Sequence, residues 1–235
     1  MKILLICGHG DGDCGALGTY YQEQYETREF AKVLKQAFNN YDCVCDIADD
    51  TRNYYTYLKK YSYDFKPYDY VLEIHFNAFN GKATGTEIIK RTGAKVNEVE
   101  TQILKNIADD VKYINRGVKF QQLYVMGKIQ SQGVQCSLLE VCFIDNENDM
   151  SLYEVRKSQI AQSIVNAFVE CYQIKKKEVK TMRYNHIEEI PEVYRSTIKK
   201  LIDKGILKGN EKGLDLSEDM IRVFVILDRS GAFDR

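Results

Sequence analysis

The chain alternates short apolar runs with segments in which apolar residues recur every three or four positions. Runs of this length and composition are typical of buried strands, and they are KILLIC, CVCDIA, YVLEIHFNA, TEIIKR, QLYVM and CSLLEVCFID. Segments with helical spacing lie between most of them, at residues 24–38, 98–113 and 152–172. This alternation predicts an α/β fold, with a mixed, mostly parallel sheet flanked by helices. Ser151 and Glu154 have capping-box spacing, so we expect the last helix to begin there.

A charged segment at residues 173–185, QIKKKEVKTMRYN, interrupts this pattern. We interpret it as a linker between a main domain, residues 1–174, and a small helical C-terminal domain, residues 182–235. About fifty residues is near the lower limit for independent folding. We therefore expect this tail to dock on the main domain, on a second copy of itself, or on an external ligand.

Two helices are expected in the tail. Pro191 and Gly205 suit the start and the end of the first helix, and Ser217 suits the start of the second. Their apolar faces should meet. The residues expected to face one another are Tyr194, Ile198, Leu201 and Ile202 on the first helix, and Met220, Val223, Phe224 and Leu227 on the second.

The composition excludes several classes of protein. Apolar residues make up 44% of the chain, which argues against disorder, and the formal net charge of -1 gives no general attraction to nucleic acid. The apolar runs are far too short to span a bilayer, so no membrane partner is expected. The start, MKILLICGHG, is a poor signal peptide, because its apolar stretch is short and no small-residue cleavage site follows. We expect a protein made in the cytoplasm and not exported by the general route.

The seven cysteines indicate a reducing compartment. No C-x-x-C pair is present, which argues against a zinc ribbon or a thioredoxin-like motif. Most of the cysteines lie inside apolar runs, where cysteine behaves as a small hydrophobic residue. An odd number of mostly buried thiols fits a reduced protein better than a disulfide framework.

Two histidines end apolar strands. His9 follows the first run and His75 ends YVLEIH, and the carboxyl ends of parallel strands are where open α/β folds bind ligands. Two histidines at one sheet edge can hold a metal, which needs a third ligand. Helical phase counted back from Phe30 places Glu23 on the inward stripe of the first helix, with Glu26 as the second choice. The remaining histidine, His186, is expected to be a surface residue.

Glu140 interrupts the apolar strand CSLLEVCFID. A buried carboxylate without a partner is costly, and its pKa rises toward neutrality. Beside a metal, such a group suits a general base in hydrolysis. The structural alternative is a glutamate at a strand end that pairs with an arginine, and the residue alone does not decide between the two.

Four segments, in this order, resemble the zinc-dependent N-acetylmuramoyl-L-alanine amidases, which include autolysins and the endolysins of phages that infect Gram-positive bacteria. The segments are CGHGDGDCGALG, the glutamate before FAKVLKQAF, EIHFNAFNGKATGTEI and LLEVCFIDNENDM. The resemblance covers roughly residues 1–172. It implies that His9, Glu23 and His75 bind Zn²⁺ and that Glu140 is catalytic. The family often has Asp-Pro before the first Gly-His, where this chain has Ile-Cys. This difference leaves the three zinc ligands in place and makes Cys7 a candidate for one additional ligand.

The resemblance implies a peptidoglycan hydrolase that cleaves the amide between N-acetylmuramic acid and the L-Ala of the stem peptide, with Glu140 activating a zinc-bound water. The missing export signal suits a phage lysin released through a holin, or a prophage product, that acts on the bacterial wall. The tail is similar to short helical tails that serve in wall targeting or in self-association, the latter as a homodimer. Two alternatives stay open: a zinc carboxypeptidase or endopeptidase acting on the peptide stem, and a non-catalytic wall-binding protein.

Overall fold

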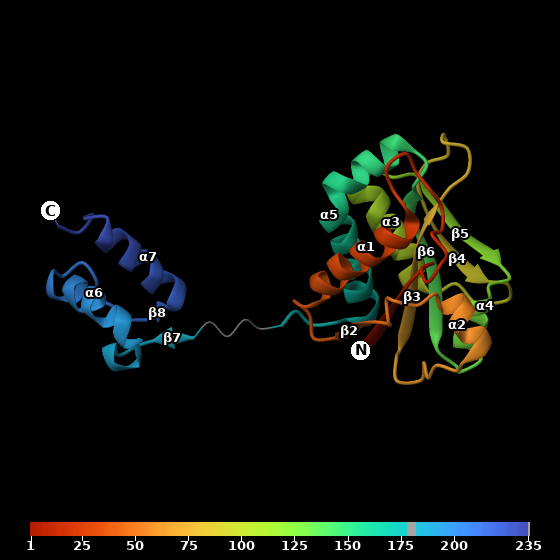
Figure 1. Ribbon diagram of the computed structural model, residues 1–235. Coiled ribbons are helices and arrows are strands. Elements are labelled where there is room, and N and C mark those ends of the chain that lie inside the picture. The colour runs from red at the N-terminus through yellow and green to blue at the C-terminus, as the bar shows by residue number, and fades with distance from the viewer. Residues whose placement is uncertain (178–181, 235) are drawn as a thin grey trace. The chain divides into compact units, whose positions relative to one another are not determined.

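A computed structural model describes residues 1–177 and 182–234 of the chain. The chain divides into two compact units, Met1–Lys177 and Glu178–Arg235, and each is described here by itself (Figure 1). The predicted linker at 173–185 lies partly outside the described residues. Its first part belongs to the first unit, because Lys176 forms a bridge with Tyr41.

A six-stranded mixed sheet forms the centre of the first unit, in the order β2-β1-β3-β6-β4-β5. β4 pairs antiparallel with β6 and parallel with β5, so these two strands run against the other four, which are parallel to one another. The predicted α/β fold with a mixed, mostly parallel sheet is therefore confirmed. The strands are β1 (Lys2–Cys7), β2 (Val44–Ile47), β3 (Tyr70–Asn77), β4 (Thr86–Arg91), β5 (Asn115–Gln121) and β6 (Gln135–Phe143).

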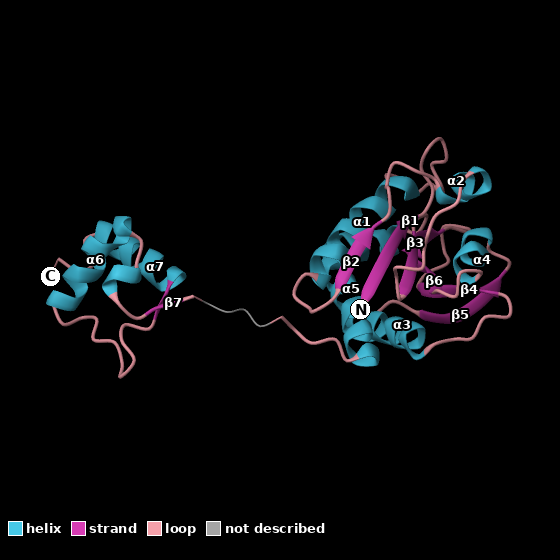
Figure 2. Ribbon diagram, turned by 90° about the horizontal axis from the view of Figure 1, so that it is seen from below, coloured by secondary structure: helices cyan, strands magenta, loops and turns pink. Residues whose placement is uncertain are grey.

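Helices cover both faces of this sheet (Figures 1 and 2). One face lies under α1, α3 and α5 and carries the larger core, while α2 and α4 cover a smaller core on the other face. Because side chains alternate along a strand, the four central strands β1, β3, β6 and β4 supply residues to both cores. The helices are α1 (Glu23–Phe38), α2 (Tyr54–Lys60), α3 (Glu98–Val111), α4 (Tyr124–Gln130) and α5 (Glu147–Tyr172).

The carboxyl ends of β1, β3 and β6 lie at the same edge of the sheet. His9 follows β1 after one intervening glycine, and His75 stands near the end of β3. In the strand register His75 lies directly opposite Glu140 of β6, and Glu140 lies opposite Glu87 of β4. The topology therefore places one imidazole and two carboxylates in a row across three neighbouring strands.

One predicted strand and one predicted helix start in this unit were wrong. The run QLYVM, residues 122–126, is not a strand, since β5 ends at Gln121 and α4 begins at Tyr124. The run is too short for its periodicity to distinguish the two structures. α5 begins at Glu147 rather than near Ser151, because the side chain of Asn146 accepts hydrogen bonds from two backbone N–H groups of the first turn and caps the helix earlier.

The second unit contains two helices and a two-stranded sheet with a core of its own. As predicted, Pro191 precedes the first helix, Gly205 follows its end with φ of 68°, and the Ser217 side chain caps the second helix. No helix in the described ranges is both long and apolar enough to cross a membrane. The elements are β7 (Arg183–Tyr184), η1 (Ile187–Glu189), α6 (Glu192–Asp203), β8 (Leu216–Ser217) and α7 (Glu218–Arg229).

The predicted inward face of α7 was partly wrong, since Phe224 packs against the core of the second unit as predicted but the other three residues are exposed. Ile221 and Val225 enter the core of the second unit, whereas Met220, Val223 and Leu227 are 39%, 52% and 38% exposed. α7 is apolar on more than one side, so its sequence alone does not fix the buried face. The rest of the small core determines which face is buried, and its buried members outside α7 are Tyr184, Ile190, Ile198 and Leu216.

Candidate metal centre

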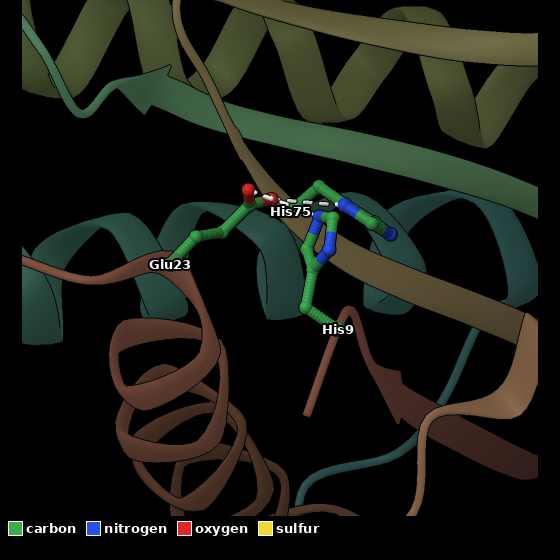
Figure 3. A group of neighbouring side chains, drawn as sticks. All are labelled: His9, Glu23 and His75. Carbon is green, nitrogen blue, oxygen red and sulfur yellow. Dashed lines mark hydrogen bonds and ion pairs between the residues drawn. The ribbon is translucent and has the colours of Figure 1, made fainter. Parts of the chain in front are cut away.

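Three side chains from separate elements converge at the carboxyl edge of the sheet (Figure 3). His9 comes from the loop after β1, Glu23 from the first turn of α1 and His75 from β3. One potential ligand atom from each residue lies within 4.8 Å of the others. Two imidazole nitrogens and one carboxylate oxygen form a donor set that suits a divalent transition metal.

Glu23 lies between the two histidines. Its Oε2 is 3.0 Å from Nε2 of His9, and its Oε1 is 2.9 Å from Nδ1 of His75. Burial alone would raise the pKa of Glu23, but the hydrogen bonds and charges of His75 and His9 outweigh burial and hold this pKa well below its usual range. The carboxylate is therefore ionised at neutral pH.

The histidines respond to the same charge. Burial lowers the pKa of each imidazole, but hydrogen bonding to Glu23 outweighs it and raises both pKa values, strongly so for His75. Each ring also has an outer carboxylate. Nδ1 of His9 is 2.9 Å from Oδ2 of Asp13, and Nε2 of His75 is 3.3 Å from Oε1 of Glu73.

Close packing of the β1 loop against the site requires glycine. A Cβ on Gly8 would lie 2.4 Å from Cε1 of His75, and a Cβ on Gly15 would lie 2.6 Å from Oε2 of Glu23. His9 itself has φ of 60°, a left-handed conformation that is uncommon outside glycine. Backbone strain of this kind concentrates at functional sites, where the surrounding contacts maintain it.

Arg28 supplies much of that constraint. Its half-buried guanidinium donates to five backbone carbonyls that belong to three segments of the chain. Two of the acceptors are the carbonyls of Gly8 and His9, each at 2.9 Å, and a third is that of Asp50 at 2.7 Å. Arg28 thus clamps the loop that presents His9 onto α1.

Glu140 has no polar partner for one of its oxygens. Its Oε2 is buried and makes no hydrogen bond within the described part of the chain. Burial raises the pKa of Glu140 to about 7; the neighbouring His75 opposes this rise, and the charges of Glu23 and Glu87 add to it. The alternative prediction, an ion pair between Glu140 and an arginine, does not occur among the described residues.

The neighbouring carboxylate, Glu87, is fully compensated. Its Oε2 lies 2.6 Å from Nε of Arg116 and 2.5 Å from Nζ of Lys119, and its Oε1 accepts from Nδ2 of Asn77 at 2.9 Å. These cations of β5 are committed to Glu87. Glu140, directly opposite Glu87 in the sheet, has no lysine or arginine partner among residues 1–177 and 182–234.

The other candidates lie outside the group of three. Glu26 is buried three residues further along the first turn of α1, and its Oε2 has no partner among the described residues. Cys7 lies in the core at the end of β1, and burial raises the pKa of its thiol to about 12, so it stays protonated. His186 is exposed, as predicted.

Three residues that touch the histidines carried different signals in the sequence. Asp13 lies in the loop after the first strand, where an acid four residues beyond His9 could have drawn attention. Glu73 interrupts an apolar strand, which is the same signal that identified Glu140. Arg28 carried no signal, because its partners are carbonyls that only the fold brings together.

A cavity of about 440 Å³ opens beside the two histidines. It lies between the sheet and the α2 and α4 side of the unit, and Tyr55 and Tyr124 meet edge to face at its wall, with 5.7 Å between their ring centroids. The wall is acidic and aromatic. Its residues are Cys7, His9, Asp13, Asn53, Tyr54, Tyr55, Glu73, His75, Gln122, Leu123, Tyr124, Val125 and Leu138.

Comparison with known proteins identifies similar sequences. The family model described as N-acetylmuramoyl-L-alanine amidase matches residues 3–170. A sporulation-specific N-acetylmuramoyl-L-alanine amidase of Bacillus subtilis (strain 168) is 26% identical over 183 residues, which are 75% of this chain and 70% of the relative. The N-acetylmuramoyl-L-alanine amidase CwlM of Bacillus licheniformis is 28% identical over 167 residues, or 70% of this chain and 64% of the relative.

Solved structures share the fold of the first unit. The catalytic domain of the CD27L endolysin, described as targeting Clostridia Difficile, superposes with a TM-score of 0.59 at 27% identity, covering 72% of this chain and 97% of that one. An N-acetylmuramoyl-L-alanine amidase from Clostridium difficile 630 superposes with a TM-score of 0.62, covering 73% and 96% of the two chains. At 19% identity, the second likeness concerns the fold alone.

The contact between Gly8 and His75 gives a prediction. Gly8→Ala should weaken the affinity of this group of residues for a divalent transition metal by about 10- to 100-fold, the range typical when an imidazole that binds a metal loses its support, because the added methyl group displaces the His75 ring. Competition with a chromophoric chelator measures the affinity, and circular dichroism checks the fold. Gly127→Ala is the matched control, since a Cβ there first meets the flexible side chain of Arg91 at 3.3 Å. Equal affinity of folded Gly8→Ala and wild type would show that this packing is dispensable.

Proposed function

Because the chain belongs to the N-acetylmuramoyl-L-alanine amidase family, whose model matches residues 3–170, we propose that it cleaves the amide between N-acetylmuramic acid and the L-Ala of the peptidoglycan stem peptide. One observation carries the proposal. The group of His9, Glu23 and His75 lies beside a glutamate, Glu140, that has a buried oxygen without a partner in the described ranges. Metal ligands next to a free carboxyl are what metal-assisted amide hydrolysis requires.

Zinc is the metal we propose for this centre. Catalytic zinc sites use three protein ligands of these types and leave a position for water or substrate. The carboxylate of Glu23 already contacts both imidazoles, so the three donors are held together by the fold itself. When bound, zinc would polarise the scissile carbonyl and lower the pKa of a water molecule.

Glu140 is the residue that we expect to move the proton. A carboxyl group with a pKa of about 7 can both accept and release a proton near neutral pH, as a general base and acid must. Glu140 would take a proton from the attacking water, whose oxygen adds to the carbonyl carbon. It would return that proton to the amide nitrogen as the carbon–nitrogen bond breaks. The products are a lactyl carboxylate and the free amine of L-Ala.

New chemical ends distinguish this reaction from its alternatives. Purified walls treated with the protein should gain amino-terminal L-Ala. A carboxypeptidase or endopeptidase with the same metal centre would instead free ends within the stem peptide. A non-catalytic wall-binding protein would release neither. End-group labelling with mass spectrometry of the released peptides therefore tests the proposed bond.

The role of Glu140 gives a second prediction. Glu140→Gln should fold and bind zinc as wild type does but lose about 10²- to 10⁴-fold in turnover, since a general base typically contributes that factor. Release of amino-terminal L-Ala and bound zinc are measured on the same samples. Glu147→Gln, which neutralises an exposed carboxylate in the first turn of α5, is the control and should remain active. Near-native activity of Glu140→Gln would reject Glu140 as the general base, and loss of zinc from this variant would indicate that Glu140 is a metal ligand.

The biological setting that we propose is lysis of a bacterial wall by a phage or prophage enzyme. The 27% identity to the catalytic domain of the CD27L endolysin supports an endolysin. This chain also matches amidases of bacteria, one of them sporulation-specific, so a domain of this family also occurs in bacterial proteins. We propose that the wall is the site of action in either case.

We further propose that residues 1–174 carry the chemistry and that residues 182–235 bind the wall or associate as a homodimer. Each unit has a core of its own. The end of the first unit is tied down, because Lys175 accepts from the N–H of Asp42 and the N–H of Lys177 donates to Asn40, both at 2.8 Å. A chain that ends at Lys177 therefore keeps these contacts.

The division gives a third prediction. Residues 1–177 alone should cleave solubilised muropeptides as the full chain does, but should act on intact walls more weakly, by up to roughly 10²-fold, because local concentration at the surface is lost. Activity of both chains on both substrates tests this, with wall pull-down of residues 182–235. Loss of zinc from the shortened chain would show that the tail is part of the main core. If both chains lysed intact walls equally well, targeting by the tail would be excluded and self-association would remain as its role.

A further inference from the structure

Glu73 is a buried carboxylate to which the proposed reaction gives no role. It lies two residues before His75 on β3, so both side chains project from the same face of the strand. The residue is only 7% exposed, and its Oε1 is 3.3 Å from Nε2 of His75. Its partners in the strand register are apolar, Ile6 of β1 and Leu138 of β6.

The charge of Glu73 has no other partner that would account for its burial. Burying a carboxylate is costly unless it is paired and hydrogen-bonded. Within the described ranges its one ion-pair partner is His75, and no lysine or arginine lies within 4.0 Å of it. The adjoining cavity adds none, because no residue of its wall is a lysine or an arginine. The position of Glu73 is therefore explained by the imidazole that it touches.

The other histidine has the same arrangement. His9 directs Nε2 toward Glu23 and Nδ1 toward Asp13, while His75 directs Nδ1 toward Glu23 and Nε2 toward Glu73. Each ring thus lies between the shared central carboxylate and an outer carboxylate of its own. An imidazole that binds a metal through one nitrogen commonly donates its other N–H to a carboxylate, which fixes the tautomer and strengthens the ligand.

The two outer carboxylates differ in exposure. The side chain of Asp13 is 51% exposed and that of Glu73 is 9% exposed. Asp13 therefore contacts His9 where solvent is also available as a hydrogen-bond acceptor, whereas the buried Glu73 is itself the acceptor that covers the ring edge of His75. Glu73 should therefore be the harder of the two to replace.

We propose that Glu73 is a positioning residue for His75. It accepts the hydrogen bond from Nε2–H, so that Nδ1, the nitrogen that lies 2.9 Å from Oε1 of Glu23, is the one that would bind a metal. The inference rests on the proposed metal centre and adds to it the residue that sets the orientation of one ligand. It does not depend on which bond in peptidoglycan is cleaved.

Zinc affinity of three variants tests this proposal in the full-length chain without substrate. Glu73→Ala and Glu73→Leu remove the acceptor, and the leucine also fills the space, so a folded variant is available even if the alanine leaves a damaging hole. Both should bind zinc about 10- to 100-fold more weakly than wild type. Glu73→Gln should keep most of the affinity, because its amide oxygen can accept the same hydrogen bond. Chelator competition gives the dissociation constants, and thermal unfolding of the metal-free proteins checks the fold.

Wild-type affinity in folded Glu73→Leu would overturn the proposal, and so would a glutamine variant as weak as the leucine variant. A carboxylate that served the substrate instead would leave zinc affinity unchanged in all three variants and raise KM for stem peptides that carry a free amine. That result would also overturn the proposal. A protein that binds zinc through these residues but releases no amino-terminal L-Ala would contradict the proposed function and leave the Glu73 result intact.

Discussion

The site depends on one buried carboxylate, that of Glu23. Each of its oxygens serves one histidine and one backbone N–H: Oε2 lies 3.0 Å from His9 and accepts from Ala16, and Oε1 lies 2.9 Å from His75 and accepts from Phe76. Four hydrogen-bonded groups around a 3% exposed residue satisfy the charge that burial would otherwise penalise. They also join the β1 loop, α1 and β3 at one point, so the three proposed ligands are held together by the fold itself.

The sheet topology decides what surrounds that point. Because β1, β3 and β6 are parallel, their carboxyl ends bring His9, His75 and Glu140 to one edge. The reversed strand β4 adds Glu87 to the same row, and the cations of β5 neutralise it. Glu140 is thereby left buried and uncompensated, with a raised pKa, beside the proposed metal centre. Of these two carboxylates in adjacent strands, Glu87 is the one that has cationic partners among the described residues.

Much of this was accessible from the sequence, because strand ends and helical phase are local patterns. The alternation of strands and helices predicted the sheet, and the phase of α1 favoured Glu23 over Glu26. Predictions failed where the outcome depended on distant contacts. The run QLYVM contains the start of α4, and α5 is capped by Asn146, earlier than predicted. The buried face of α7 is determined by residues elsewhere in its small core. The clamp of Arg28 was inaccessible for the same reason, since its acceptors are carbonyls of separate segments.

Metal content of two matched variants tests the account most directly. Glu23 and Glu26 are both buried acids in the first turn of α1, and they differ in that Glu23 alone contacts the histidines. Elemental analysis after dialysis against trace zinc should give one zinc per chain for wild type and for Glu26→Gln, and almost none for Glu23→Gln. Zinc retained by Glu23→Gln and lost by Glu26→Gln, or no zinc in the wild-type protein, would contradict the centre of His9, Glu23 and His75.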